Sequence, residues 1–212
     1  MFPSRLVSVL GKGALENNYA LEFDGSNDRV KIDSVIGDLG SSATFSAWIY
    51  RANTDGYHYF FDARNNSGAG FVQGNSGNTT INKSSGTVYV DGVASSTLAT
   101  GGWHHLAITG MTINITQDLM IGVHLGGSAF SFPGKMDEYA IWNTSLSAGD
   151  ISALYQARGT ADLNDDGNSA NLVGWWRMGD GDTFPTITDN STNSNDGTMT
   201  NMTASDIVKD TP

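Results

Sequence analysis

The sequence has no cysteine, three glutamates, and 11 Lys and Arg residues against 22 Asp and Glu. Without cysteine, a disulfide framework and a thiolate metal site are both excluded. The formal net charge of −11, with no basic cluster among the aromatic residues, argues against nucleic acid as a partner. No stretch approaches the ~18 consecutive apolar residues of a membrane helix. We therefore expect no membrane insertion, and the short apolar run Leu6 to Leu10 does not read as a secretory signal.

The residues that are abundant favour β-structure. The chain has 26 glycines and many Asp, Asn, Ser and Thr residues, whereas the helix formers Glu and Lys are scarce. Alternating apolar runs recur at intervals of roughly ten residues, with turn-forming residues between them. This pattern predicts an all-β fold, a two-sheet antiparallel jelly-roll β-sandwich.

The strands can be placed from the alternation. The stretch YALEFDGSNDRVKI (residues 19–32) predicts two strands paired across a tight turn, and ATFSAWIY (residues 43–50) predicts a strand that is apolar on both faces. Further strands are expected at residues 57–62, 70–73, 87–93, 103–110, 118–125, 130–143 and 172–178. In the last of these, Trp175 and Trp176 should point to opposite faces of the sheet.

One short helix is expected near residues 147–157. Ser147 is suited to be its N-cap, and Asp150 places a carboxylate where the helix dipole favours it. Ile151, Leu154 and Tyr155 form an apolar stripe, and Gly159 ends the helix. We expect this helix to close one edge of the sandwich.

The sequence pattern predicts an N-terminal arm followed by one domain. Residues 1–18 form an N-terminal arm, either a partly ordered end or a short strand that docks on another copy. Residues 19–212 form a single domain, with closing strands from residues 172–202.

The turn after the first strand contains Asp24, Asn27 and Asp28, which could supply oxygen ligands to a hard cation such as Ca²⁺. The alternative is that these residues are present because Asp, Asn and Gly form turns. An enzyme is not indicated: Glu138 beside Asp137 should lie on the opposite face of its strand, so no catalytic carboxylate pair is evident. For carbohydrate binding, the tryptophans and several tyrosines offer aromatic platforms, although most should lie in the core. The tryptophans are Trp48, Trp103, Trp142, Trp175 and Trp176.

Four stretches taken together carry a family resemblance: ALEFDGSNDRVKI, FSAWIYRA, WHHLAIT and FPGKMDEYAIWNTSLSAGDISALY. They resemble the laminin-G-like (pentraxin-like) jelly-roll branch of the concanavalin A-like lectin/glucanase superfamily, over roughly residues 19–158. The segment LVGWWRM, which comes first in many members, comes late here. The arrangement also resembles laminin-G-like members from bacteriophage virions.

The resemblance implies a role outside a cell. It adds Asp137 to Asp24, Asn27 and Asp28 as a metal ligand, with Ca²⁺ as the cofactor. The function it implies first is a non-enzymatic virion structural or surface protein (a decoration, fibre or tail-associated subunit), localised to the virion or extracellular space. Its partners would be other virion proteins or copies of itself. The alternative is a calcium-assisted carbohydrate-binding adhesion module for cell-surface glycans, and a glycan hydrolase is the least favoured.

Overall fold

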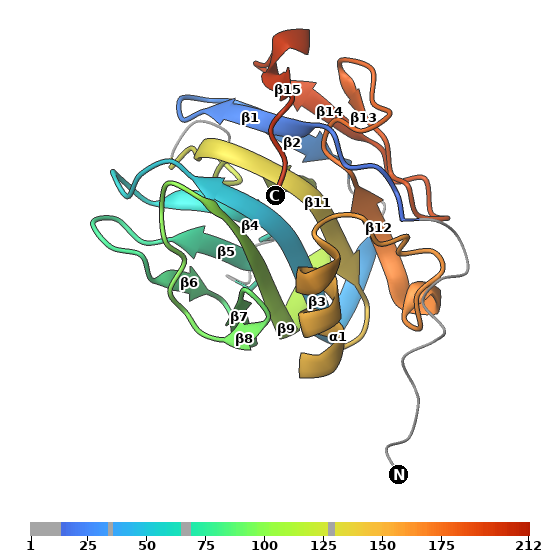
Figure 1. Cartoon of the computed structure of the whole chain (residues 1–212). Helices are drawn as coiled ribbons and strands as arrows, with labels where there is room; N and C mark the ends of the chain where they lie inside the picture. The colour runs from blue at the N-terminus through green and yellow to red at the C-terminus, as the bar shows by residue number, and fades with distance from the viewer. Residues whose placement is uncertain (1–13, 34–35, 65–68, 127–129) are drawn as a thin grey trace.

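The computed structural model describes residues 14–33, 36–64, 69–126 and 130–212, which form two antiparallel sheets packed face to face (Figure 1). The first sheet, sheet A, has the order β15-β1-β11-β3-β9-β7-β8, with β12 also paired to β11. The second, sheet B, has the order β13-β14-β2-β10-β4-β5-β6. The predicted jelly-roll β-sandwich is confirmed.

The strands of sheet A are β1 (Ala20–Asp24), β3 (Gly37–Arg51), β7 (Thr87–Val90), β8 (Val93–Ala94), β9 (Trp103–Ile115), β11 (Pro133–Trp142), β12 (Leu172–Trp176) and β15 (Ile207–Val208). Those of sheet B are β2 (Arg29–Ile32), β4 (His58–Asp62), β5 (Phe71–Gly74), β6 (Ile81–Lys83), β10 (Leu119–Ile121), β13 (Thr186–Ile187) and β14 (Gly197–Thr200). Two 3₁₀ turns, η1 (Ser169–Asn171) and η2 (Ala204–Asp206), complete the described elements with helix α1 (Ala148–Ala157).

The core lies between the sheets, as the alternation of β3 predicts. Phe45, Ala47 and Ile49 are fully buried there, and Phe45 packs against Phe61 of sheet B with ring centroids 5.5 Å apart. Trp176 joins this core, whereas Trp175 lies on the opposite face of sheet A in a second apolar cluster. The predicted division of the two tryptophans between the faces is confirmed.

The pairing expected for the first two strands was wrong. β1 and β2 do not pair with each other: β1 pairs with β11 and β15 in sheet A, and β2 pairs with β10 and β14 in sheet B. The turn between them therefore carries the chain from one sheet to the other.

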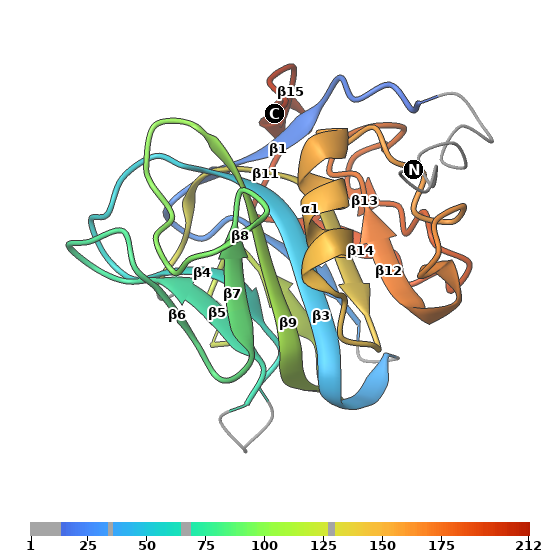
Figure 2. The same ribbon diagram turned by 60° about the horizontal axis from the view of Figure 1, so that its bottom comes forward.

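Helix α1 has the predicted cap. The Ser147 hydroxyl accepts a hydrogen bond from the Asp150 N–H (3.2 Å), and the Asp150 carboxylate accepts one from the Ser147 N–H (2.9 Å). The helix does not close an edge, however: Figure 2 shows it lying across the outer face of sheet A, over β3. Ile151 is buried in the cluster with Trp175, and Tyr155 stacks on Trp48 with centroids 5.7 Å apart. The helix thus covers Trp48 on the outer face of β3.

The N-terminal arm lies partly outside the described residues, which begin at residue 14. Residues 14–18 lie against the sandwich: the Leu15 N–H donates to the Thr160 carbonyl (3.0 Å), and Arg177 donates to the Glu16 carbonyl (2.6 Å). Among the described residues, no helix has the length and hydropathy needed to cross a membrane.

Candidate functional site

A groove of about 430 Å³ opens at one end of the sandwich. Three connections form it, and each passes from one sheet to the other: the β1–β2 turn, the β3–β4 loop and the segment that leads into β11. Figure 1 shows the β1–β2 turn and the β3–β4 loop at the same end of the molecule. The lining residues are Asp24, Gly25, Asn53, Asp55, Gly56, Tyr57, His58, Phe130, Ser131 and Pro133.

Local contacts fix these connections. Gly25 has a φ of 79° and lies so close to Pro133 that a Cβ atom would come within 2.9 Å of the proline Cβ, so only glycine fits. The Ser131 hydroxyl donates to the Ser26 carbonyl (2.7 Å). The Asn53 side chain accepts from the Asp55 N–H (2.9 Å), which shapes the β3–β4 loop as an Asx turn. The groove is therefore formed before any ligand arrives.

Two exposed aromatic rings line the groove. Tyr57 is 43% exposed and Phe130 is 49% exposed, and their rings meet nearly at right angles (89°) with centroids 5.8 Å apart. Phe130 has a φ of 59°, a left-handed backbone that is unfavourable for a bulky residue and is associated with functional positions. Such rings provide the apolar faces on which sugar rings stack.

The sequence analysis missed these two residues because it placed both at the start of a strand. β4 begins at His58 and β11 at Pro133, so Tyr57 and Phe130 both lie in loops. The tryptophans considered as platforms are instead mostly core: Trp48, Trp142, Trp175 and Trp176 are buried. Trp103 is half-buried and donates its indole N–H to Asp210 (3.1 Å).

The groove is acidic. Asp24, at the end of β1, and Asp55, in the β3–β4 loop, are both exposed. His58 adds no positive charge, because burial and the neighbouring Arg51 lower its pKa to about 4. The mouth of the groove therefore carries two carboxylates and an amide beside two aromatic rings.

The predicted metal ligands are only partly brought together. Asp28 accepts from the Asp24 N–H (2.9 Å) and Asp24 from the Ser26 N–H (2.7 Å), so both carboxylates stabilise the turn itself. Burial, followed by the charge of Asp24, raises the pKa of Asp28. The Asn27 carbonyl accepts from Arg29 (3.2 Å) and from the Asn201 side chain (3.2 Å).

Asp137 does not reach this turn. Asp24 pairs with Pro133, and Asp137 lies four residues further along β11, roughly 13 Å away at the strand rise. Calcium takes six to eight oxygen ligands. The described residues contain no group of three or more His, Asp or Glu side chains placed to hold a metal. The predicted set of four does not fit the ion as a set, and calcium binding by the Asp24–Asp28 pair stays a prediction.

Asp137 and Glu138 lie side by side, not on opposite faces as expected. Glu138 has a φ of 48°, and the pairing of β11 with β3 shifts register between Asp137 and Ala140, so a β-bulge turns both carboxyls outward. Asp137 accepts from the Asn17 side chain (2.8 Å), and Glu138 accepts from Trp175 (2.6 Å) and Arg177 (2.8 Å). Burial raises the pKa of both groups, that of Glu138 to about 7. Both carboxyls are buried and bound to protein groups, so neither faces an open cleft.

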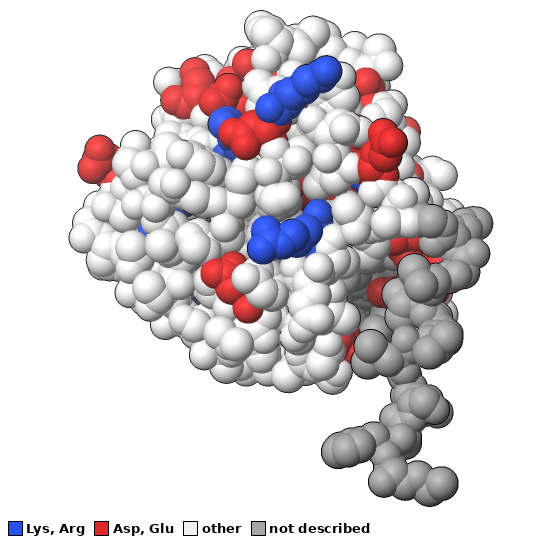
Figure 3. All heavy atoms as spheres, in the orientation of Figure 1, with Lys and Arg blue, Asp and Glu red and all other residues white. Residues whose placement is uncertain are grey.

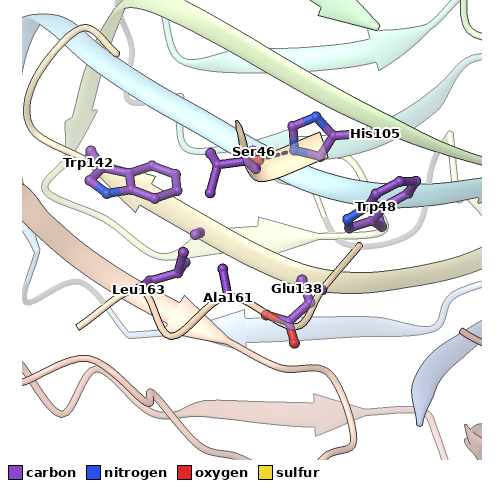
Figure 4. A pocket seen from close by; sticks show the side chains of 10 residues that line it. Ser46, Trp48, His105, Glu138, Trp142, Ala161 and Leu163 are labelled. Carbon is purple, nitrogen blue, oxygen red and sulfur yellow. Dashed lines mark hydrogen bonds between the residues drawn. The ribbon is translucent and has the colours of Figure 1, made fainter. Parts of the chain in front are cut away.

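A second, much smaller cavity of about 20 Å³ lies between α1 and the outer face of sheet A (Figure 4). Within it, Ser46 and His105 form a hydrogen bond of 2.8 Å. Both are buried, and burial lowers the pKa of His105 to about 4. The volume holds about one water molecule, so this Ser–His pair has no room for a substrate.

Comparisons with known proteins agree with this architecture. The model of the concanavalin A-like lectin/glucanases superfamily, in its laminin G form, matches residues 24–115. A proposed carbohydrate-binding protein from Bacteroides ovatus has a similar structure, with a TM-score of 0.60 and 16% identity over 89% of this chain. This chain covers 60% of the length of that protein.

A native heptameric SAP-like pentraxin from Limulus polyphemus is less similar, with a TM-score of 0.45 and 13% identity over 66% of this chain and 82% of its own. No curated protein matches the sequence. The match over residues 24–115 and the fold around it therefore agree with the resemblance to the concanavalin A-like lectin/glucanases superfamily that the sequence motifs carry.

Proposed function

We propose that this domain is a non-enzymatic carbohydrate-binding module whose ligand lies in the groove between the three connections. The observation that carries the proposal is the pair of exposed rings, Tyr57 and Phe130, beside the polar groups of Asp24, Asn53 and Asp55. Stacking on aromatic rings suits a saccharide, and so do carboxylates that accept hydrogen bonds from hydroxyl groups and amides that donate or accept them. The similarity to a proposed carbohydrate-binding protein supports the fold of such a module.

The geometry gives no support to hydrolysis. A glycosidase needs two carboxyls flanking the substrate, one of them kept protonated by its surroundings. Asp137 and Glu138 are buried and tied to Asn17, Trp175 and Arg177. Asp24 and Asp55 are both exposed, and neither lies in an apolar pocket.

A place on the surface of a virion, predicted from the sequence resemblance, is compatible with the same groove. A glycan-binding module at that position would attach the particle to a cell surface, with other virion proteins or copies of the chain as further partners. Sedimentation of the full chain tests the assembly part, because a strict monomer would contradict a self-associating subunit.

The binding function is tested with a glycan array, followed by titration of any ligand found. We expect Tyr57→Ala and Phe130→Ala each to weaken binding about fivefold, since a lost aromatic stack costs on the order of 1 kcal/mol. Phe184→Ala is the matched control, because Phe184 is 40% exposed but does not line the groove. Equal loss in all three variants, or no ligand for the wild type, would contradict the proposal.

A further inference from the structure

We infer that the groove selects sugars that carry a protonated amine and discriminates against sugars that carry a carboxylate or sulfate. This inference rests on the proposed function and names the ligand class of the same groove. It depends on which charges face the groove and on where the buried guanidinium of Arg51 points.

Negative charge reaches the groove from more than one segment of the chain. Asp24 lies at the end of β1 and Asp55 in the β3–β4 loop, and no Lys or Arg is among the lining residues. No ion pair among the described residues includes either carboxylate. Behind the rim, Asp28 lies close enough to Asp24 and Asp206 to be affected by their charges. Figure 3 shows acidic side chains at the left end of the face, where the β3–β4 loop lies in Figure 1, and the larger basic patches nearer the middle and top.

The buried guanidinium of Arg51, near the groove, does not point into it. Arg51 lies behind His58, and its guanidinium donates to the carbonyls of Asn75 (2.7 Å) and Asn78 (3.0 Å) and to the His58 ring (3.3 Å). These bonds hold it against the β5–β6 connection, and Arg51 does not line the groove. His58 is neutral near physiological pH, since its pKa is lowered to about 4. An anionic sugar would therefore meet two carboxylates and no lining cation.

The aromatic rings favour the same class of ligand. Tyr57 and Phe130 are exposed and line the same groove as the two carboxylates. An ammonium group gains a cation–π contribution over such a ring as well as attraction to the carboxylates. A neutral sugar would gain only stacking and hydrogen bonds. An acidic sugar would bind more weakly, because its charge is repelled by the two carboxylates.

The test compares three oligosaccharides of matched length: glucosamine oligomers, their N-acetylated counterparts and galacturonic acid oligomers. The binding titration is run near pH 5.5, where the sugar amine is protonated. We expect the glucosamine oligomer to bind about two- to fivefold tighter than the N-acetylated one for each carboxylate it meets. The galacturonic acid oligomer should bind weakest. Raising the pH to about 8.5, where the amine is neutral, should remove the preference.

Variants assign the effect to the groove. Asp55→Asn and Asp24→Asn should each reduce the preference for the amine about two- to fivefold, measured as the ratio of the dissociation constants of the N-acetylated and amine oligomers within each variant. Asp38→Asn is the matched control, because Asp38 is exposed and accepts from the N–H two residues on (2.9 Å), as Asp24 does, but lies outside the groove.

The two proposals fail in different ways. Binding of the N-acetylated or acidic oligomer as tightly as the amine, or an array whose ligands are all amine-free, would overturn the charge selection and leave carbohydrate binding in place. Failure of every saccharide to bind would overturn both.

Discussion

Gly74 lies directly against the guanidinium group of Arg51, where a Cβ atom would come within 2.6 Å of Cζ. Gly74 is the last residue of β5, and Arg51 the last residue of β3, so this contact joins the two sheets near the groove. Arg51 is fully buried and is held by carbonyl groups, which makes the fit intolerant of added atoms.

We therefore expect Gly74→Ala to lower the free energy of unfolding by about 1–3 kcal/mol, since overpacking a buried site forces neighbours to move. Urea denaturation measures this change in the free energy of unfolding. Gly167→Ala is the control, because nothing lies within 4 Å of the position that its Cβ would take. If both variants lose the same stability, the contact with Arg51 is not the cause.

Asp28→Asn should stabilise the protein at neutral pH by about 0.5–1 kcal/mol. Burial and the charges of Asp24 and Asp206 raise the pKa of Asp28 in the folded state above 3.8. The folded state thus holds the proton more tightly, and wild-type stability falls as the pH rises through that range. The variant has no carboxyl to ionise at this position and does not lose this stability. The difference in free energy of unfolding between variant and wild type should therefore disappear in acid. Unfolding curves at about pH 3 and pH 7 test it, and a variant less stable at both pH values would contradict it.

Calcium at the β1–β2 turn is tested by melting with and without chelator. Only Asp24 and Asp28 meet there, which corresponds to a weak site of millimolar class at best. We expect a small calcium-dependent rise in Tm for the wild type and none for Asp24→Ala. Tight stoichiometric binding would contradict this reading of the turn, and no rise at all would leave the residues as turn formers.

Buried carboxyls under residues 14–18 should make the protein less stable as the pH rises. The folded-state pKa of Glu138 is raised from 4.5 to about 7 and that of Asp137 is also raised, so stability present below about pH 4.5 is lost as these groups ionise. Asp137→Asn should flatten this dependence. In the wild type Asn17 Oδ1 has no hydrogen-bond partner among the described residues. After the Asn17 amide group rotates by about half a turn, the amide of the variant can donate to this oxygen. Urea curves from about pH 4 to pH 8 measure the slope, with Asp38→Asn as an exposed control that should not change it.

The parts of this fold that the sequence predicts are those with local causes. Helix α1 depends on the capping pair Ser147 and Asp150, whose atoms lie within one turn of each other, and both ends were placed to within about two residues. The strands follow from alternation, and the two faces of Trp175 and Trp176 follow with them.

What the sequence could not predict depends on pairing between distant segments. Alternation locates β1 and β2 but does not say that β1 pairs with β11 and β2 with β14. The bulge at Glu138 breaks the period of two on which the opposite-face assignment rested. The groove is least predictable, because Tyr57 and Phe130 are 73 residues apart in the chain and meet only in the folded structure.

The three connections around the groove have a mechanical consequence. Each one begins in one sheet and ends in the other, so each part of the rim is anchored to both sheets. Sliding one sheet of the sandwich over its partner by a fraction of an ångström would alter the separation of Asp24 and Asp55 together with the angle between the two rings. The width of the groove therefore depends on the relative position of the two sheets. A ligand that fits the groove would oppose sliding of one sheet over the other.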